Sequence, residues 1–201
     1  MRLWATRLVV AVAILGHPRV GAAQGAAEIE RFSALLSVRG SMTVAEIGAG
    51  SGTFTVGLAK RLDGDGRIFA TELDPSRLEE IRGAVTAATL GNVTVLEAGV
   101  ESTNLPDACC DLVYMRDVYH HLTKPSATLA SIASALRAGG RLAVIDFRPR
   151  GQAPPGSAPN RGGHGIARAQ LEAEVTAAGF DIVSASDDWP GGNFIVVFAK
   201  R

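Results

Sequence analysis

Cysteine is almost absent from this chain of 201 residues, which contains only Cys109 and Cys110. Adjacent cysteines cannot easily bridge each other, so the pair predicts no disulfide framework and no fold that depends on one. We expect both side chains to be small buried residues that come just before a strand.

An excess of charge is also missing, because 20 lysines and arginines balance 20 aspartates and glutamates. Domains that bind nucleic acid usually carry a basic patch or stripe, and the sequence shows none, so we expect no nucleic-acid partner. Hydrophobic residues make up 47% of the chain, too many for a disordered protein and enough for a packed core. The length then favours a single domain.

No apolar run reaches the ~20 residues that a membrane-spanning helix needs. A shorter run at residues 8–15 follows Arg2 and Arg7, and small residues come after it up to Ala23. This order is typical of a secretory signal. We therefore expect residues 1–23 to be a signal peptide, residues 24–201 to form one domain, and the protein to be exported without stable membrane insertion after cleavage. The alternative is an ordinary first helix in a cytoplasmic protein.

Strand-like and helix-like patterns alternate along the rest of the chain. The alternation predicts an α/β fold with a mainly parallel sheet and helices on both faces. In such a sheet, ligands bind outside the carboxyl ends of the strands, so the residues that follow the first four strands form the candidate site. The expected strands are 43–47, 67–71, 93–96, 111–115, 141–147, 180–183 and 194–198; the expected helices are 26–38, 53–62, 74–88, 126–137 and 167–178.

The first strand runs into a turn that holds Gly48, Gly50 and Gly52. Glycines at such a turn let the backbone approach a ligand without side-chain clash. The dinucleotide fingerprint needs glycine or alanine three residues after its second glycine, and this chain has Thr53 there. The spacing therefore argues against a pyrophosphate site and against a nicotinamide-dependent oxidoreductase.

Glu72 ends the second strand and adds independent weight to a cofactor site. A carboxylate has two acceptor oxygens and a ribose diol has two donors, so an acid in this place is suited to bind ribose. The alternative is an acid that favours the dipole of the next helix. Asp74 lies closer to the start of that helix.

The segment from Glu46 to Gly52 resembles motif I of class I S-adenosylmethionine-dependent methyltransferases, and Glu72 to Asp74 resembles their second motif. Residues 111–122 resemble their fourth strand with its loop, and 136–142 the turn into their fifth strand. The resemblance covers about residues 31–200. It implies a Rossmann-like sheet of seven strands with the last one antiparallel, and an enzyme that transfers a methyl group from S-adenosyl-L-methionine to a small-molecule acceptor. The alternative is a cofactor-binding protein without catalysis.

The same motifs imply which residues lie against the cofactor. One departure concerns the adenine end, where many relatives carry aspartate and this chain has Val100. Either Glu101 replaces that acid or backbone groups bind the adenine. The cofactor-binding residues implied are Glu46, Gly48, Ala49, Gly50, Gly52, Glu72, Leu73, Val100, Glu101 and Arg116.

The loop after the fourth strand lies where the transferable methyl group should point. His120, His121 and Asp117 are the candidate catalytic residues, because histidine titrates near neutral pH and can take the acceptor's proton. In the alternative, the histidine pair packs or caps the loop. We expect substrate contacts from Tyr119 and, in the loop at 149–165, from Arg161 and His164, unless these loop side chains are simply solvated.

The histidine pair with Asp117 could also suggest a metal site. Neighbouring residues in a loop rarely point to one centre, and no further ligand clusters with them in the sequence. We therefore expect no metal.

Overall fold

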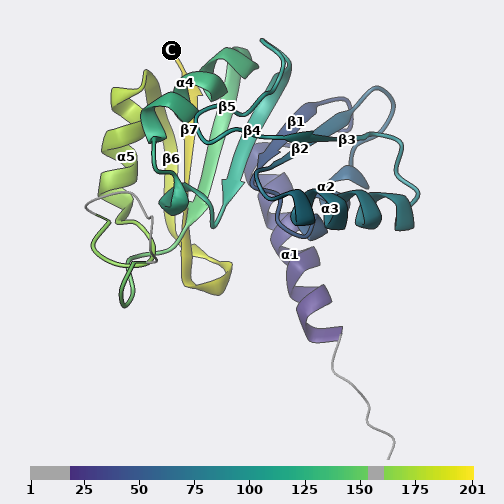
Figure 1. Cartoon of the computed structure of the whole chain (residues 1–201), viewed down its shortest axis with the longest axis horizontal. Helices are drawn as coiled ribbons and strands as arrows, with labels where there is room; N and C mark the ends of the chain where they lie inside the picture. Colours follow the sequence, from purple (N-terminus) through teal and green to yellow (C-terminus); the bar gives the residue numbers. More distant parts are fainter. Residues whose placement is uncertain (1–18, 154–160) are drawn as a thin grey trace, which may run out of the picture.

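The computed structural model describes residues 19–153 and 161–201, with side chains from residue 24 onward. Seven strands form one sheet in the order β3-β2-β1-β4-β5-β7-β6 (Figure 1). The first five are parallel, and β7 lies antiparallel between β5 and β6. The strands are β1 (Thr43–Ile47), β2 (Arg67–Glu72), β3 (Val93–Glu97), β4 (Cys110–Arg116), β5 (Leu136–Asp146), β6 (Phe180–Trp189) and β7 (Asn193–Lys200). The predicted fold is confirmed.

Helices cover both faces of this sheet. On one face α1 (Arg19–Leu36) and α2 (Thr53–Ala59) pack against strand residues that include Leu112 and Tyr114 of β4, and α3 (Pro75–Ala87) packs against Ala70 of β2. On the other face α4 (Pro125–Ala135) and α5 (Arg168–Ala177) pack against Val113 and Met115. Neighbouring residues of β4 are thus buried on opposite faces, which explains why its sequence is almost continuously apolar.

The predicted helices and strands match the observed ones, apart from their bounds and two short 3₁₀ helices, of which η2 (Pro190–Gly192) lies between β6 and β7. β5 begins at Leu136, before the expected residue 141, because its pairing with β4 shifts register between Cys110 and Leu112. β6 continues to Trp189, well past the expected residue 183. It lies at the edge of the sheet, where polar exposed residues hide the strand pattern. The 3₁₀ helix η1 (Tyr119–His121) was not predicted.

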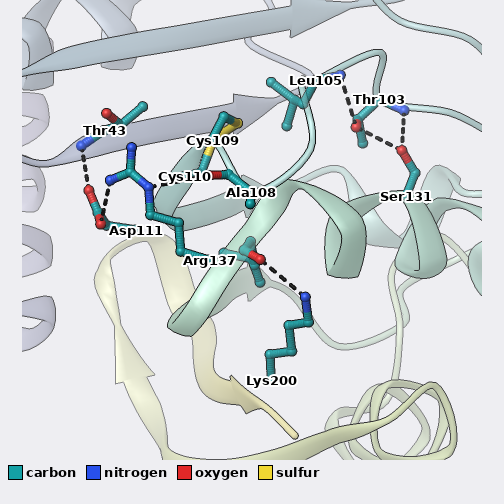
Figure 2. The surroundings of a disulfide bond; sticks show 11 residues. Thr43, Thr103, Leu105, Ala108, Cys109, Cys110, Asp111, Ser131, Arg137 and Lys200 are labelled. Atoms are coloured by element: carbon teal, nitrogen blue, oxygen red, sulfur yellow. Dashed lines mark hydrogen bonds and ion pairs between the residues drawn. A yellow bond between two sulfur atoms is a disulfide. The ribbon is translucent and has the colours of Figure 1, made fainter.

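The two cysteines differ from expectation. Cys109 and Cys110 form a disulfide bond at the start of β4 (Figure 2), so the prediction that neighbours would stay unbridged was wrong. Local torsions can bring two adjacent side chains together, and the chain already turns at Ala108, where φ is +47°. The ring joins no distant segments, so it provides no framework. It lies at the amino end of β4, while ligands of such sheets bind at the carboxyl ends.

Within the described residues, no helix is both long enough and apolar enough to cross a membrane. The predicted signal peptide falls mostly outside these residues, since only 19–23 of it are described, as the first part of α1.

Candidate active site

A cavity of about 570 Å³ opens at the carboxyl ends of β1, β2 and β4. This is the edge of the sheet at which the sequence placed the candidate site. The cavity is lined by the glycine turn after β1, the end of β2, the segment after β3 and the loop after β4.

The glycine turn forms one wall of the cavity. The backbone N–H groups of Gly48 and Ala49 donate to the carbonyl oxygen of Thr71 at 2.9 and 3.0 Å, which ties the turn to β2. Gly48 has φ of +71°, and a Cβ atom there would lie 2.6 Å from the side chain of Val118. A Cβ atom at Gly50, by contrast, would meet nothing within 4 Å. The backbone of Gly50 therefore borders open space that a ligand can occupy.

Glu72 lies in the same wall and is half-buried. Oε2 accepts from the N–H of Gly50 at 2.9 Å, and Oε1 accepts from the N–H groups of Leu73 and Asp74 at 2.8 and 3.4 Å. A carboxylate offers about four lone-pair sites, so Oε2 can still accept from one ribose hydroxyl. Asp74 takes the alternative role, because its side chain caps α3 through the N–H of Ser76.

Glu46 lies deeper, at the end of β1, and is almost completely buried. Burial raises the pKa of this carboxyl group to about 7, although the hydroxyl of Thr55 donates to it and opposes the rise. The guanidinium of Arg116 also lines the cavity, lies over the ring of Phe54 at 5.5 Å and donates to Asp117 at 2.9 Å. An acid and a cation thus lie at this end of the cavity.

The two residues expected at the adenine end differ in their access to the cavity. Val100 lines the cavity and is 58% exposed, as an apolar residue beside an open binding surface would be. Glu101 does not line it and pairs with Lys124 instead. The geometry therefore favours backbone groups of residues 98–100 over Glu101. Of the other implied cofactor residues, Gly52 does not line the cavity and is the N-cap of α2, whereas Ala49 and Leu73 do line it.

The loop after β4 separates its two histidines. His121 is exposed and lines the cavity, whereas His120 is buried and does not. His120 Nδ1 lies 2.8 Å from Oδ1 of the buried Asp146, and its backbone N–H donates to Oδ2 of the same carboxylate at 3.1 Å. Sequence reasoning missed Asp146. Its position as an acid at the carboxyl end of the fifth strand was the available signal.

His121 is the histidine with access to a ligand. Its ring stacks on that of His120 at 3.9 Å between centroids. Partial burial, together with His120 and His164, lowers the pKa of His121 below its usual value. The ring is therefore neutral at neutral pH and can accept a proton.

Asp117 also lines the cavity, at a positive φ of +58°. One carboxylate oxygen accepts from the side-chain amide of Asn193 at 2.8 Å, and the other accepts from Arg116 at 2.9 Å. With both oxygens engaged, this carboxylate is suited to hold Arg116 and the start of β7 in place.

Two of the residues expected to contact the substrate do not line the cavity. Tyr119 is fully buried and its hydroxyl donates to Glu174 of α5 at 2.9 Å. Arg161 is also buried and donates to the same carboxylate at 2.7 Å. Both therefore anchor the loops to α5. Their polarity suggested substrate binding because nothing in the sequence indicated their common partner, Glu174.

His164 does not line the cavity, but its Nε2 atom lies 3.1 Å from Nε2 of His120. The inference that no further ligand clusters with the histidine pair was therefore wrong. Forty-four residues separate the two positions, so only the fold brings them together.

Comparison with known proteins agrees with this geometry. Residues 45–144 match the family model described as a methyltransferase domain, which spans the glycine turn, Glu72 and both histidines after β4. The chain belongs to the class I S-adenosylmethionine-dependent methyltransferases. The cofactor of this family is S-adenosylmethionine.

Curated relatives include the ubiquinone/menaquinone biosynthesis C-methyltransferases UbiE of Marinomonas sp. and Enterobacter sp., which are 29% and 27% identical over 111 residues. Each alignment covers 55% of this chain and 44% of the relative, so the chain spans less than half the length of the curated relatives it matches.

Two solved structures show the same fold. A SAM-dependent methyltransferase from Aquifex aeolicus superimposes with a TM-score of 0.77 at 21% identity, covering 87% of this chain and 90% of the other. The [4+2]-cyclase SpnF superimposes with a TM-score of 0.68 at 16% identity, covering 85% and 81%.

The residues of the cavity fit the family's cofactor. The open space over Gly50 and the free lone pair on Oε2 of Glu72 suit the ribose. Glu46 and Arg116 offer an acceptor for an ammonium group and a donor for a carboxylate, the two charged groups of a methionine moiety.

Proposed function

We propose that this protein transfers the methyl group of S-adenosylmethionine to a small organic acceptor. The observation that carries the proposal is one continuous cavity that has Glu72 and the glycine turn at one part and His121 at another. Its volume of about 570 Å³ lies within the usual range for sites that bind small molecules.

Each part of the cavity has its own task. Glu72 accepts from a ribose hydroxyl, and the turn around Gly50 gives the ligand close access to the backbone. Glu46 in its ionised form accepts from the ammonium group, and Arg116 donates to the carboxylate. Asp117 and Asn193 keep Arg116 in place through their hydrogen bonds.

When bound, S-adenosylmethionine supplies an electrophilic methyl group on a positively charged sulfur. The cavity walls hold the acceptor in line with that group, and such positioning can account for much of the rate. His121 contributes the polar group at the acceptor end, where its neutral ring can take the proton that an acceptor loses. His120 acts on His121 by stacking, with its own ring fixed by Asp146.

The acceptor's class is suggested by the curated relatives. They are named as C-methyltransferases of ubiquinone and menaquinone biosynthesis, so methylation at a carbon atom is the first reaction to test. Apolar residues near the acceptor end of the cavity, Val118 and Leu122, suit a largely apolar small molecule.

Calorimetry with the purified chain tests the cofactor part of the proposal. We expect binding of S-adenosylmethionine or S-adenosylhomocysteine and no binding of NAD. Glu72→Ala should weaken binding by about 1–3 kcal/mol, because the ribose donors lose a charged acceptor. Glu97→Ala is the matched control, since Glu97 ends β3 beside Glu72 but does not line the cavity. NAD binding without sulfonium binding would contradict the proposal.

Methyl transfer itself is tested by incubating the protein with methyl-labelled cofactor and a small-molecule extract. We expect label to appear in an organic fraction and to disappear when His121→Ala replaces the wild-type protein. Tight cofactor binding with no transfer to any fraction would instead support the alternative, a cofactor-binding protein without catalysis.

A further inference from the structure

Three histidines meet beside the cavity. His120 and His121 come from η1, and His164 comes from the loop before α5. One ligand nitrogen from each of the three rings can be chosen so that all lie within 4.8 Å of one another. Nε2 of His120 and Nε2 of His164 are 3.1 Å apart.

Asp146 decides which nitrogen of His120 is available. This carboxylate is fully buried and also accepts from the backbone N–H groups of His120 and Phe147, so its position is fixed. Its Oδ1 lies 2.8 Å from Nδ1 of His120, and a carboxylate can only accept, so Nδ1 carries the proton. The lone pair of His120 is therefore on Nε2 and points at His164. A carboxylate behind a histidine in this way is the usual second partner of a metal-binding imidazole.

We propose that His120, His121 and His164 bind one Zn²⁺ ion. With Zn–N bonds of about 2.0–2.1 Å, two nitrogens of a tetrahedral site lie about 3.3–3.4 Å apart. The separation of 3.1 Å between His120 and His164 is close to this value. His121 is exposed, so its side chain can rotate the remaining distance towards the other two.

The surroundings support a held site. The backbones of Arg150 and His164 bond to each other in both directions, at 2.8 and 3.0 Å. The ring of Phe147 packs against His120 and His164 at 4.7 and 5.1 Å, which provides an apolar wall. A simple hydrogen bond between two histidines would explain the short contact, but it would not require the third ring to join them.

Three protein ligands leave one position of a tetrahedral zinc open. Because His121 also lines the cavity, an ion bound to it would be reachable from the cavity. An oxygen atom of the methyl acceptor that takes the open position would lose its proton to solvent more easily, and in this zinc-bound form His121 would be a ligand and not the base. That use of the site rests on the proposed function, whereas zinc binding does not.

The test is a titration of the purified, untagged chain with Zn²⁺ against a chromophoric chelator, without cofactor or acceptor. We expect one Zn²⁺ per chain and a loss of affinity of about 100-fold or more in His164→Asn. Asp146→Asn should weaken binding about 10–100-fold, because it removes the carboxylate that orients His120. Mg²⁺, which prefers oxygen ligands, should not compete.

The titration uses the full-length chain, which keeps residues 1–23, and His17→Asn is the matched control for adventitious binding, because His17 is the one other histidine of this chain. Thermal melting in the presence of chelator shows whether each variant folds. If His164→Asn does not fold, His121→Gln serves as the second variant, because the side chain of His121 is exposed. Zn²⁺ should raise the melting temperature of the wild type but not of the variants. Absence of 1:1 binding, or equal affinity in His121→Gln and His164→Asn to the wild type, would overturn the proposal. Cofactor binding would be unaffected by that result, so the two proposals fail separately.

Discussion

Two carboxylates at the ends of neighbouring strands have different environments within one cavity. Glu72 is half-buried and accepts from three backbone N–H groups, so folding provides partners for its charge. Glu46 is almost completely buried, and burial raises its pKa to about 7. A site that binds a cation can keep such an acid, because the ligand stabilises the charge that the empty site disfavours.

We predict that Glu46 lowers the stability of the cofactor-free protein as pH rises. The pKa of Glu46 is about 7 in the folded protein and 4.5 as a free group. The contribution of this carboxyl group to the free energy of unfolding is therefore fully present below pH 4.5 and is lost as pH rises through 7. Glu46→Gln should remove this loss, so at pH 8 the free energy of unfolding of the variant should exceed that of the wild type by up to ~3 kcal/mol. Urea unfolding from pH 5 to 8 measures this difference in the free energy of unfolding. Plots of that free energy against pH that run parallel for the variant and the wild type would contradict the prediction.

The pH dependence of cofactor affinity should be opposite to the pH dependence of stability that Glu46 causes. The ionised carboxylate accepts from the ammonium group, so wild-type affinity should rise between pH 6 and 8 and stay flat in Glu46→Gln. A variant more stable than the wild type but weaker in binding would separate the two effects.

The neighbouring histidines should respond differently to replacement. His121→Ala should lower turnover by roughly 10²-fold or more with little change in cofactor affinity, because the ring lines the acceptor end. His120→Ala should lower the free energy of unfolding by about 2–3 kcal/mol, because it leaves the buried Asp146 without its partner. Measurements of turnover, cofactor affinity and melting temperature distinguish the catalytic role of His121 from the structural role of His120. Similar small losses of turnover and stability at both positions would exclude both roles.

At the scale of helices and strands, apolar patterns predicted the elements that the core requires. β4 and β7 are buried on both faces, so their sequences are nearly continuous apolar runs. β6 is an edge strand whose exposed polar half carries no such pattern, and η1 is too short to show any. Glu46, Gly48 and Glu72 could be placed because each follows directly from a strand end.

Contacts between distant segments could not be read in the same way. Glu174 accepts hydrogen bonds from Tyr119 and Arg161. Asp146 and His164 both contact the ring of His120. Each of these pairings depends on how α5 and its preceding loop pack on the sheet. The sequence showed polar residues in loops, and solvent or substrate was the simplest partner to assign to them.

The first helix offers a test at this scale. The N-terminal part of α1 projects beyond the sheet (Figure 1), and Ile29, Phe32 and Leu36 are its buried apolar residues from Gln24 onward, where side chains are described. Removal of residues 1–23 should therefore leave the melting temperature almost unchanged.

Phe32→Ala is the contrasting variant. Phe32 is fully buried against Phe54 and Tyr114, with ring centroids 5.4 and 4.8 Å away, so we expect a loss of about 3–5 kcal/mol. Thermal melting of both variants decides whether α1 docks through the residues after 23. A large loss on truncation alone would show that earlier residues also contribute.

For the whole molecule, we propose export with removal of the signal at residues 1–23, as the order of basic, apolar and small residues indicates. Mass spectrometry of the protein from its native host should find a chain that starts close to Gln24. An intact Met1 in a cytosolic fraction would reverse the proposal. An exported enzyme would also need a supply of S-adenosylmethionine outside the cytosol.

The place of β7 in the sheet has a consequence for biosynthesis. It lies between β5 and β6, yet it is made last of the three, at Asn193–Lys200. While the ribosome is still producing the preceding segments, β5 has no neighbour on one side, and its exposed edge can pair with another nascent chain. Completion of the sheet must therefore wait until translation has passed residue 193, and a chaperone that shields the edge of β5 until then would raise the yield of folded protein.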